Sequence, residues 1–455
     1  MKIKILHGLE GAKKAMRNFL ITTPLIFCLS IGIIFPFSYP TMIVNAIILG
    51  LVCARVLPYR KFAYAFLIFT ILYSSILYIH SGISMTVTGI LSFLTVHYFS
   101  QRLSMKGRQF VLIVLGLMSF GMFIIFFSDG NTLAEYMRVP PEYFKSDMDS
   151  YLNTFYLQKE GLGFYDSFAS SIKMFQEGNY PTELWAWKQP LIFYLWYLLP
   201  GNGISIVYLA AGFFSLDLIA AFFIARKFLP PAKAILSPLI LLPYFHYPLT
   251  VKTVLQVEWW ALSFFIWGIT AVLYRRYLGA GILFAICLAI RTLFAIPIAF
   301  IVAIPLFSGK IKDTAKIMFT TLIIFIPYYF LLHFKNISRY VDLNSLLNNS
   351  LRNASDHGWH LVRTTLAYSS WNYGVFPIRP FLVLIILTSL LLILLCMKNN
   401  NKKPYLILLA SYLPFFILEF RLPMLDIWHD YWGIYYIPLL LIASSIALLS
   451  KFKTK

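Results

Sequence analysis

Charged side chains are scarce in this sequence. Asp, Glu, Lys and Arg together make up 12% of its 455 residues, whereas a soluble domain carries about 25%. Hydrophobic residues account for 60% of the chain and aromatic residues for 18%. This composition excludes a soluble protein and predicts an all-α, polytopic integral membrane protein.

Cysteine is also rare, and acidic residues are outnumbered. The four cysteines stand singly within apolar segments, and their spacing fits neither a zinc site nor a disulfide framework. The 38 Lys and Arg residues against 18 Asp and Glu give a net charge of +20. Because the basic residues form short clusters between apolar runs, they follow the positive-inside pattern of membrane proteins. A basic groove for nucleic acid is not indicated, and no nucleic-acid partner is expected.

Apolar runs long enough to cross a bilayer recur along the whole chain. At about 17–20 residues per span, the sequence predicts about fourteen transmembrane helices. They lie near residues 19–37, 41–57, 62–80, 83–99, 110–128, 204–225, 234–251, 256–274, 278–290, 292–308, 317–334, 376–397, 405–420 and 433–450.

The placement of the basic residues predicts the orientation of these spans. With the N-terminus in the cytoplasm, 25 of the 38 Lys and Arg residues fall in inner segments, and every short inner loop is basic. Both termini, including a tail over 451–455, are therefore expected in the cytoplasm. The polar segment 129–190 and a second loop over 335–375 are expected on the outer side.

The segment 129–190 is the longest polar stretch, and it divides the chain. It holds half of the acidic residues: Asp129, Glu135, Glu142, Asp147, Asp149, Glu160, Asp166, Glu177 and Glu183. Short amphipathic helices are predicted over 151–157 and 166–175. Residues 188–199 are too few to span and predict an interfacial or re-entrant helix. We expect a four-span module over 1–109, followed by a membrane core over 110–450.

Asp147 and Asp149 are the first candidates for chemistry. A carboxylate can deprotonate a hydroxyl or help to hold a divalent cation such as Mg or Mn, and the sequence leaves the metal requirement open. Two carboxylates this close in an apolar cleft repel each other, so one pKa is expected to be raised. The alternative is that both are solvated loop residues or helix caps.

Further candidates border the apolar runs. Arg291 lies between two of them, where an arginine costs roughly 2.5–3.5 kcal/mol at the bilayer centre and needs a partner. That partner is either a lipid phosphate or an acidic residue in a structural ion pair. Glu258 opens a predicted span and either pairs with nearby Lys252 or lines a polar cavity. Three adjacent polar residues lie at the outer end of the last predicted span: His429, Asp430 and Tyr431.

Three stretches together resemble the GT-C superfamily of membrane glycosyltransferases, of the protein mannosyltransferase and aminoarabinose transferase type. SDMDSYLNTFYLQKEGLGFY followed by WKQPLIFYLWYLL is similar to the acidic first outer loop and its proline segment, with KQP where the family has a double proline. RRYLGAGILFAICLAIRTLFAIPIAFI is similar to a Gly-rich helix followed by a basic residue and a second helix. WHDYWGIYYIPLLLIASS resembles the late H-x-Y-Y stretch.

The resemblance implies sugar transfer from a polyprenyl-phosphate carrier, with inversion, on the outer face of the membrane. Asp149 or Asp147 would act as general base on the acceptor, which is a glycan, a lipid or a protein. Arg291 and Lys188 would bind the donor phosphate. Glu258, His429, Asp430 and Tyr431 would line the same cavity.

Two other classes of function remain open at this stage. A lipid-linked polysaccharide polymerase or ligase would use outer arginines, for which the sequence offers Arg339, Arg352 and Arg363. A lipid or solute transporter would place ionisable groups deep in the membrane, where the sequence offers Asp217. The alternative for Asp217 is a structural role, in which its carboxylate forms a hydrogen bond with a neighbouring helix.

Overall fold

The structure is a computed structural model that describes residues 47–48, 107–124, 132–182, 184–307, 310–355, 379–419 and 430–450. Within these residues all regular structure is helical, and no strand occurs. The all-α prediction is therefore confirmed for this part of the chain. The first four predicted spans, apart from residues 47–48, and the tail over 451–455 lie outside the described residues.

Ten of the predicted spans lie wholly or mostly within the described part of the chain, and each contains a helix there. The corresponding helices are α5 (Gly107–Ile124), α10 (Ile204–Arg226), α11 (Pro231–Ala234) with α12 (Leu236–His246), α13 (Val257–Leu273), α14 (Tyr277–Ile290), α15 (Ala295–Phe307), α16 (Ile311–Pro327), α20 (Arg379–Lys398), α21 (Lys403–Glu419) and α22 (Ile437–Leu449).

Two described helical segments are long and apolar enough to cross a membrane. They are Ile204–Arg226, with 23 residues, and Ile311–Ile337, with 27 residues, which joins α16, the π-helical η6 (Tyr328–Phe334) and α17 (Lys335–Ile337). Six further apolar helical stretches of the described part are shorter, at 10–17 residues each. One reason is that the chain leaves the helical conformation at Arg291, where α14 ends and the short η5 (Thr292–Phe294) begins. The count of fourteen spans stays a prediction.

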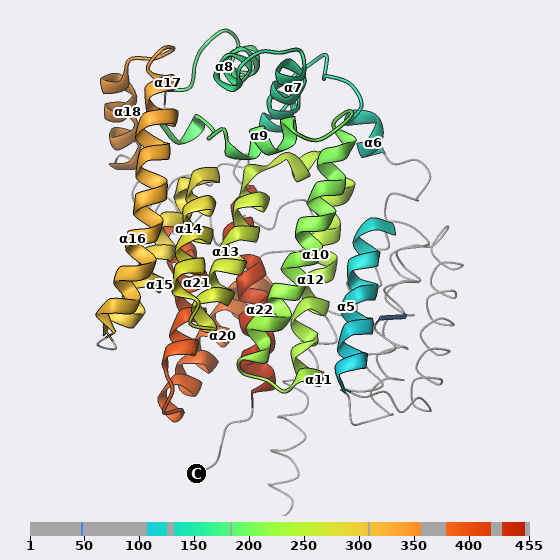
Figure 1. Cartoon of the computed structure of the whole chain (residues 1–455), viewed down its shortest axis with the longest axis vertical. Helices are drawn as coiled ribbons and strands as arrows, with labels where there is room; N and C mark the ends of the chain where they lie inside the picture. The colour runs from blue at the N-terminus through green and yellow to red at the C-terminus, as the bar shows by residue number, and fades with distance from the viewer. Residues whose placement is uncertain are drawn as a thin grey trace, which may run out of the picture.

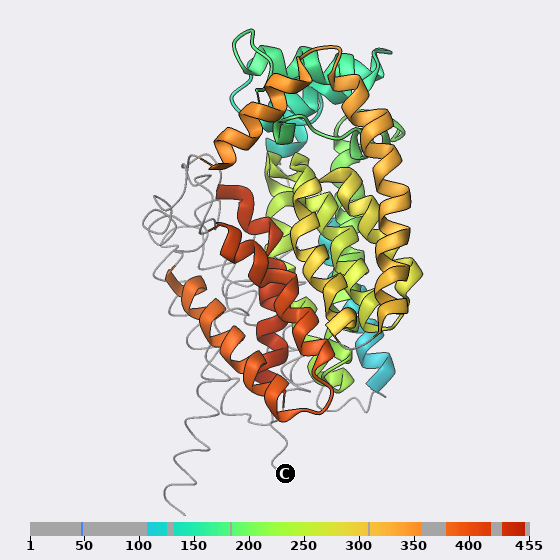
Figure 2. The same ribbon diagram turned by 90° about the vertical axis from the view of Figure 1, so that its left-hand side faces the viewer.

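The helices form a long body with a helical cap across one end (Figures 1 and 2). We use "cap" for α6 (Thr132–Tyr136), α7 (Asp147–Lys159), α8 (Phe164–Phe175), η2 (Leu184–Ala186) and α9 (Leu191–Tyr197). At the same end, α17 and α18 (Leu343–Ser355) lie beside the cap. The turns from α10 to α11 and from α20 to α21, which carry predicted inner basic residues, lie at the opposite end.

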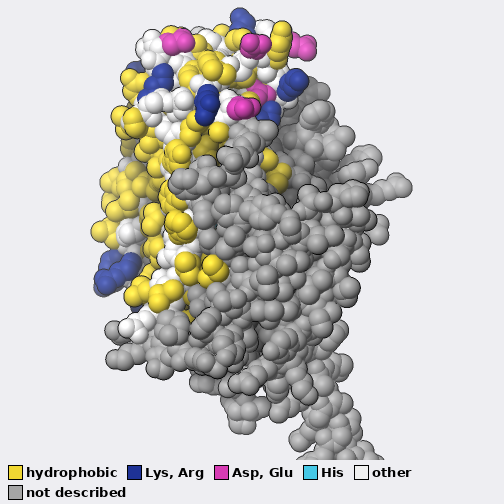
Figure 3. All heavy atoms as spheres, turned by 90° about the vertical axis from the view of Figure 1, so that its right-hand side faces the viewer, with side chains coloured by type: hydrophobic (Ala, Val, Ile, Leu, Met, Phe, Trp, Pro, Cys, Tyr) yellow, Lys and Arg dark blue, Asp and Glu magenta, His cyan; other side chains and the backbone are white. Residues whose placement is uncertain are grey.

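The surface differs between the two parts. Figure 3 shows acidic and basic side chains together on the cap, hydrophobic side chains along the body, and basic side chains again near the lower end. Along the α16 segment, large apolar side chains such as Phe319, Phe330 and Leu331 are more than half exposed. A helix of this kind loses little by facing lipid, whereas in water its apolar surface would be costly.

Aromatic side chains hold the cap together. Tyr151 and Phe155 of α7 are buried, and Tyr151 packs against Phe168 of α8 and Phe193 of α9. Glycine allows the cap to approach the body: a Cβ at Gly203, just before α10, would lie 2.5 Å from the carbonyl oxygen of Met137. The expected short helices of this segment are confirmed, with α7 longer than predicted.

The body has a continuous apolar core with the carboxylate of Asp217 deep inside it. Phe214 of α10 stacks on Phe245 of α12, and both contact Trp259 of α13. Asp217, one turn below Phe214, is fully buried and accepts a hydrogen bond from the Ser263 hydroxyl of α13. The expected hydrogen bond from Asp217 to a neighbouring helix is therefore confirmed.

Candidate functional site

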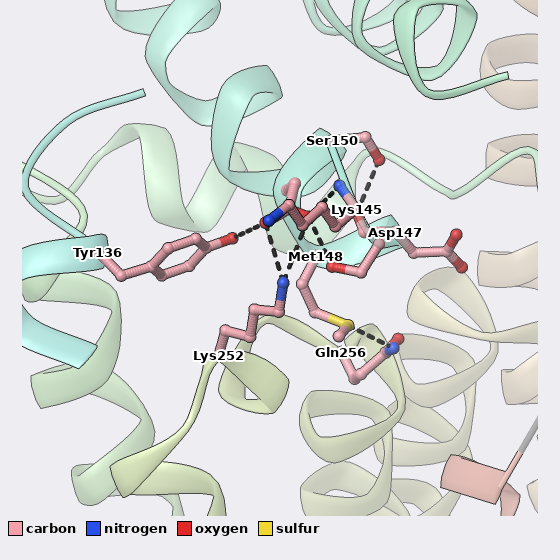
Figure 4. Close-up of polar contacts among 9 residues, drawn as sticks. Tyr136, Lys145, Asp147, Met148, Ser150, Lys252 and Gln256 are labelled. Carbon is pink, nitrogen blue, oxygen red and sulfur yellow. Dashed lines mark hydrogen bonds and ion pairs between the residues drawn. The ribbon is translucent and has the colours of Figure 1, made fainter. Parts of the chain in front are cut away.

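Asp149 is the centre of a hydrogen-bonded cluster where the cap meets the body. Figure 4 shows two side chains of this cluster, Tyr136 and Lys252, pointing toward the start of α7. One carboxylate oxygen accepts from the Tyr136 hydroxyl at 2.6 Å. The other accepts from the backbone N–H of Lys145 at 2.7 Å and from the Ser146 hydroxyl at 2.8 Å. Lys252 of η4 (Lys252–Leu255) completes the cluster, with its Nζ 3.2 Å and 3.3 Å from the two oxygens. The Asp149 side chain is 3% exposed.

The sequence folds locally in this way because Ser146 is the N-cap residue of α7 and Asp149 is three residues further on. This is the spacing of a capping box, in which the acid reaches back to the residues before the helix. An acid in the first turn is also favoured by the helix dipole. Asp149 therefore fixes where α7 begins and ties α6 and η4 to it.

These contacts set the protonation of Asp149. Burial acts to raise its pKa, but the hydrogen bonds from Tyr136, Ser146 and the Lys145 amide, together with the charge of Lys252, hold the pKa below its usual value. The expectation that repulsion between the two aspartates raises one pKa is therefore wrong for Asp149. The physical reason is that each oxygen receives donors that stabilise the ionised form.

Asp147 faces another direction. Figure 4 shows its carboxylate turned away from Tyr136 and Lys252. Its hydrogen bond comes from the Tyr151 hydroxyl and is long, at 3.4 Å. Asp147 is half-buried, so this carboxylate keeps acceptor capacity that Asp149 has already used.

Lys188 and Arg291 form a second group of charges below α7. Both residues are 5% exposed. Burial and the nearby positive charge of Arg291 lower the pKa of Lys188 to about 8, against the opposing influence of Glu258 and Asp147. The ammonium lies 5.7 Å from the centre of the Tyr151 ring. Among the described residues, no hydrogen bond or ion pair neutralises Lys188.

The KQP segment is held against the end of α14, and this places Lys188 beside Arg291. With its amide nitrogen toward α14, Gln189 donates to the carbonyl oxygens of Leu288 and Ala289, at 2.8 Å each. These carbonyls belong to the last turn of α14, where no backbone donor is available within the helix. Tyr328 of η6 donates to the Ala289 carbonyl at 3.0 Å and accepts from the Leu191 amide at 3.1 Å.

Arg291 shares its Nε–H between a carboxylate and a phenol. Nε lies 3.0 Å from Glu258 Oε1 and donates to the Tyr435 hydroxyl at 2.8 Å. Tyr435 in turn donates to the same Glu258 oxygen at 3.3 Å. Glu258 is fully buried, and its second oxygen, Oε2, has no hydrogen-bond partner. One carboxylate thus balances part of the charge of two buried cations.

The structure changes one expected pairing. Glu258 pairs with Arg291 and not with Lys252, because the first turn of α13 faces the break after α14. Lys252 reaches the cap instead and pairs with Asp149. Of the two partners considered for Arg291, the structure shows the acidic residue, Glu258, which the sequence had placed near the same cavity.

The late aromatic stretch contributes a residue that the sequence analysis passed over. Asp430 and Tyr431 begin η7 (Asp430–Tyr435), of which only the backbone is described at these two positions, and His429 lies outside the described residues. Tyr435, four residues after Tyr431, is the side chain that contacts Arg291. Tyr136 and Lys252 were also missed as partners of Asp149, although the S-x-x-D pattern at Ser146 indicates a capping role for the acid.

The aspartate pair does not fit a divalent cation. Both oxygens of Asp149 already accept hydrogen bonds, and Lys252 brings a positive charge where a cation would lie. In the described part of the chain, no group of three His, Cys, Asp or Glu side chains is placed to hold a metal ion.

Comparison with known proteins finds no matching family model, no matching curated protein and no matching solved structure.

Proposed function

We propose that this chain is a polytopic membrane glycosyltransferase. It moves a sugar from a polyprenyl-phosphate carrier to a glycan, lipid or protein acceptor on the outer face of the membrane. The observation that carries this proposal is the pair of buried cations, Lys188 and Arg291, at the junction of cap and body. Lys188 has no hydrogen bond or ion pair among the described residues, and a buried cation of this kind is costly unless an anionic ligand binds it.

The position of the pair suits a lipid phosphate. Lys188 and Arg291 lie where the polar cap meets the apolar body, so a phosphate bound there can keep its prenyl chain in lipid and its sugar under the cap. Two cations next to the phosphate also stabilise the negative charge that develops on it when its bond to the sugar breaks. The resemblance to the GT-C superfamily points to the same residues.

Asp147 is the better general base of the two aspartates. Its carboxylate influences Lys188, so it lies close to the proposed phosphate site, and it is not enclosed by donors. In the proposed step, Asp147 takes the proton of the acceptor hydroxyl, the new bond forms at C1 of the sugar, and the bond from C1 to the phosphate oxygen breaks. Asp149 holds α6, α7 and η4 in register, so that Asp147 stays in place.

The other two functions have less support. The side chains of Arg352 and Arg363 are outside the described residues, and Arg339 is exposed. Asp217 accepts a hydrogen bond from Ser263 through Oδ2, keeps Oδ1 without a partner, and is not part of the charged site. Neither observation favours a polymerase or a transporter.

Transfer in proteoliposomes tests the proposal. Polyprenyl-phosphate sugars are supplied on the outer side with a crude envelope extract as acceptor, and radioactive sugar in the product is counted. Wild type is expected to transfer the sugar, and Lys188→Met to lose most of the transfer. Absence of transfer by wild type with every donor, together with movement of lipid or solute across the bilayer, would contradict the proposal.

A further inference from the structure

The first turn of α13 presents two buried oxygens that have no hydrogen-bond partner. They are Oε1 of Gln256, the residue that precedes α13, and Oε2 of Glu258. Gln256 is 2% exposed and Glu258 is fully buried. Buried polar atoms are nearly always hydrogen-bonded in folded proteins. Two such oxygens within three residues indicate a place that a ligand completes.

Both residues adjoin the proposed reaction site. The Gln256 amide nitrogen donates to Met148 Sδ at 2.8 Å, and Met148 lies between Asp147 and Asp149 in the sequence (Figure 4). Glu258 binds Arg291 through its other oxygen and acts electrostatically on Lys188. The two oxygens therefore belong to the region between the base and the phosphate-binding cations.

The chemistry of this region selects the ligand. The Thr253 hydroxyl and the Trp259 indole N–H, on either side of this segment in the sequence, are also buried without a partner. The nearby cations, Lys188 and Arg291, are assigned to the phosphate. Gln256 Oε1, Glu258 Oε2 and Asp147 are all hydrogen-bond acceptors. A bound sugar must therefore bring donors, either hydroxyl or ammonium groups. A carboxylate on the sugar would meet two acidic side chains in a buried site and would be repelled.

We propose that Gln256 and Glu258 bind the sugar of the donor and restrict it to neutral or amino sugars, so that uronic acids are excluded. This inference rests on the proposed function and adds the class of sugar. Gln256 accepts from one sugar hydroxyl next to Asp147. Glu258 accepts from another while it holds Arg291 against the phosphate.

Binding to the purified full-length chain in nanodiscs tests the inference without turnover. The probes are polyprenyl phosphate diesters of equal charge at the phosphate: the methyl ester as reference, a neutral hexose, an amino sugar and a uronic acid. In wild type, the esters of the neutral and amino sugars are expected to bind at least about tenfold more tightly than the methyl ester. A gain of this size corresponds to one good hydrogen bond. The uronic acid is expected to show no such advantage.

Substitutions of Gln256 sharpen the test. Gln256→Leu is expected to reduce the advantage of the neutral sugar about tenfold and to leave the affinity for the methyl ester unchanged. Gln256→Glu keeps the size of the side chain and is expected to favour the amino sugar over the neutral one. Gln158→Leu is the matched control: Gln158 is also buried with an unpartnered amide oxygen, but it lies about 16 Å along α7 from Asp147.

The outcomes separate the two proposals. Equal binding of uronic acid and neutral hexose, or an undiminished sugar advantage in Gln256→Leu, overturns the inference and leaves the phosphate site standing. If the methyl ester fails to bind wild type, or binds Lys188→Met equally well, the phosphate site itself is wrong. The proposed function and the inference then fail together.

Discussion

Two groups of charges lie at the junction of cap and body, and they differ in how completely they are satisfied. The two carboxylate oxygens of Asp149 accept hydrogen bonds from the Tyr136 hydroxyl, the Ser146 hydroxyl and a backbone amide. They also pair with the Lys252 ammonium. Around Arg291, Glu258 keeps one oxygen without a partner, and the neighbouring Lys188 has a lowered pKa. The first group is complete without a ligand, and the second is not.

The difference indicates two roles for neighbouring acids. A complete network stabilises the fold, because each donor offsets the desolvation of the carboxylate. An incomplete one costs stability until something binds, which is a common property of functional sites. Asp147 belongs with the second group by its influence on Lys188, although it is only two residues from Asp149.

The largest expected effect comes from Asp147→Asn. Loss of a general base reduces the rate by about 10²–10⁴-fold, and Asp147 is half-buried with one long hydrogen bond, so the melting temperature should stay close to that of wild type. Single-turnover transfer in proteoliposomes measures the rate, and thermal unfolding in detergent measures the stability.

Asp149→Asn is the matched control for that result. In this variant, Tyr136, Ser146 and Lys252 face a neutral amide in place of a carboxylate, so the melting temperature is expected to fall. The loss of rate is expected to be smaller than in Asp147→Asn. The assignment of roles reverses if Asp149→Asn abolishes transfer at unchanged melting temperature while Asp147→Asn remains active.

Lys188→Met should weaken phosphate binding and stabilise the protein at the same time. A hydrogen bond between charged groups contributes about 1.5–3 kcal/mol, so affinity for a polyprenyl phosphate diester is expected to fall about 10–150-fold. Because burial and Arg291 disfavour the charged lysine, its removal should raise the melting temperature. A lower melting temperature would show that Lys188 has a structural partner and stabilises the fold, as the residues around Asp149 do.

The pH dependence of binding sharpens the same point. The phosphate requires the protonated lysine, and the pKa of Lys188 in the free protein is about 8. Affinity for the diester is therefore expected to be constant below about pH 7 and to fall as the pH rises through about 8. In Lys188→Arg the positive charge persists over this range, so the decline should disappear. An unchanged decline in that variant would assign the titration to another group.

Much of this architecture follows from the sequence, and the reasons are local. The helix from Ile204 to Arg226 is indicated by an apolar run, and the ends of the short cap helices are indicated by residues that break helices, such as Gly161, Gly163 and Pro181. The need of Arg291 for a partner follows from desolvation alone. These features depend on neighbours in the chain.

The contacts between residues far apart in the chain could not be predicted from the sequence in the same way. Arg291 meets Tyr435 across 144 residues, and Lys252 meets Asp149 across 103. Such contacts depend on how helices pack, which apolar periodicity does not specify. For Glu258, the nearer cation in the sequence was the wrong partner, because α13 turns its first turn toward the end of α14.

The smallest expected effect comes from Tyr136→Phe, which removes one donor from the complete group. A hydrogen bond to a charged acceptor contributes about 1.5–3 kcal/mol at most, and Lys252, 34% exposed, can still balance the carboxylate. We expect a fall of about 1 kcal/mol in the free energy of unfolding, with transfer within about threefold of wild type.

The pH dependence of this effect identifies its origin. The pKa of Asp149 is lowered in the folded state, so its contribution to stability is present above the unfolded pKa and is lost as the pH falls through the folded one. The stability difference between wild type and Tyr136→Phe should therefore be constant near neutral pH and shrink below about pH 4. Thermal unfolding at pH 7, 5 and 3.5 measures it. A difference that does not change with pH would mean that Tyr136 stabilises the cap by packing, and Asp149 would lose its place at the centre of that group.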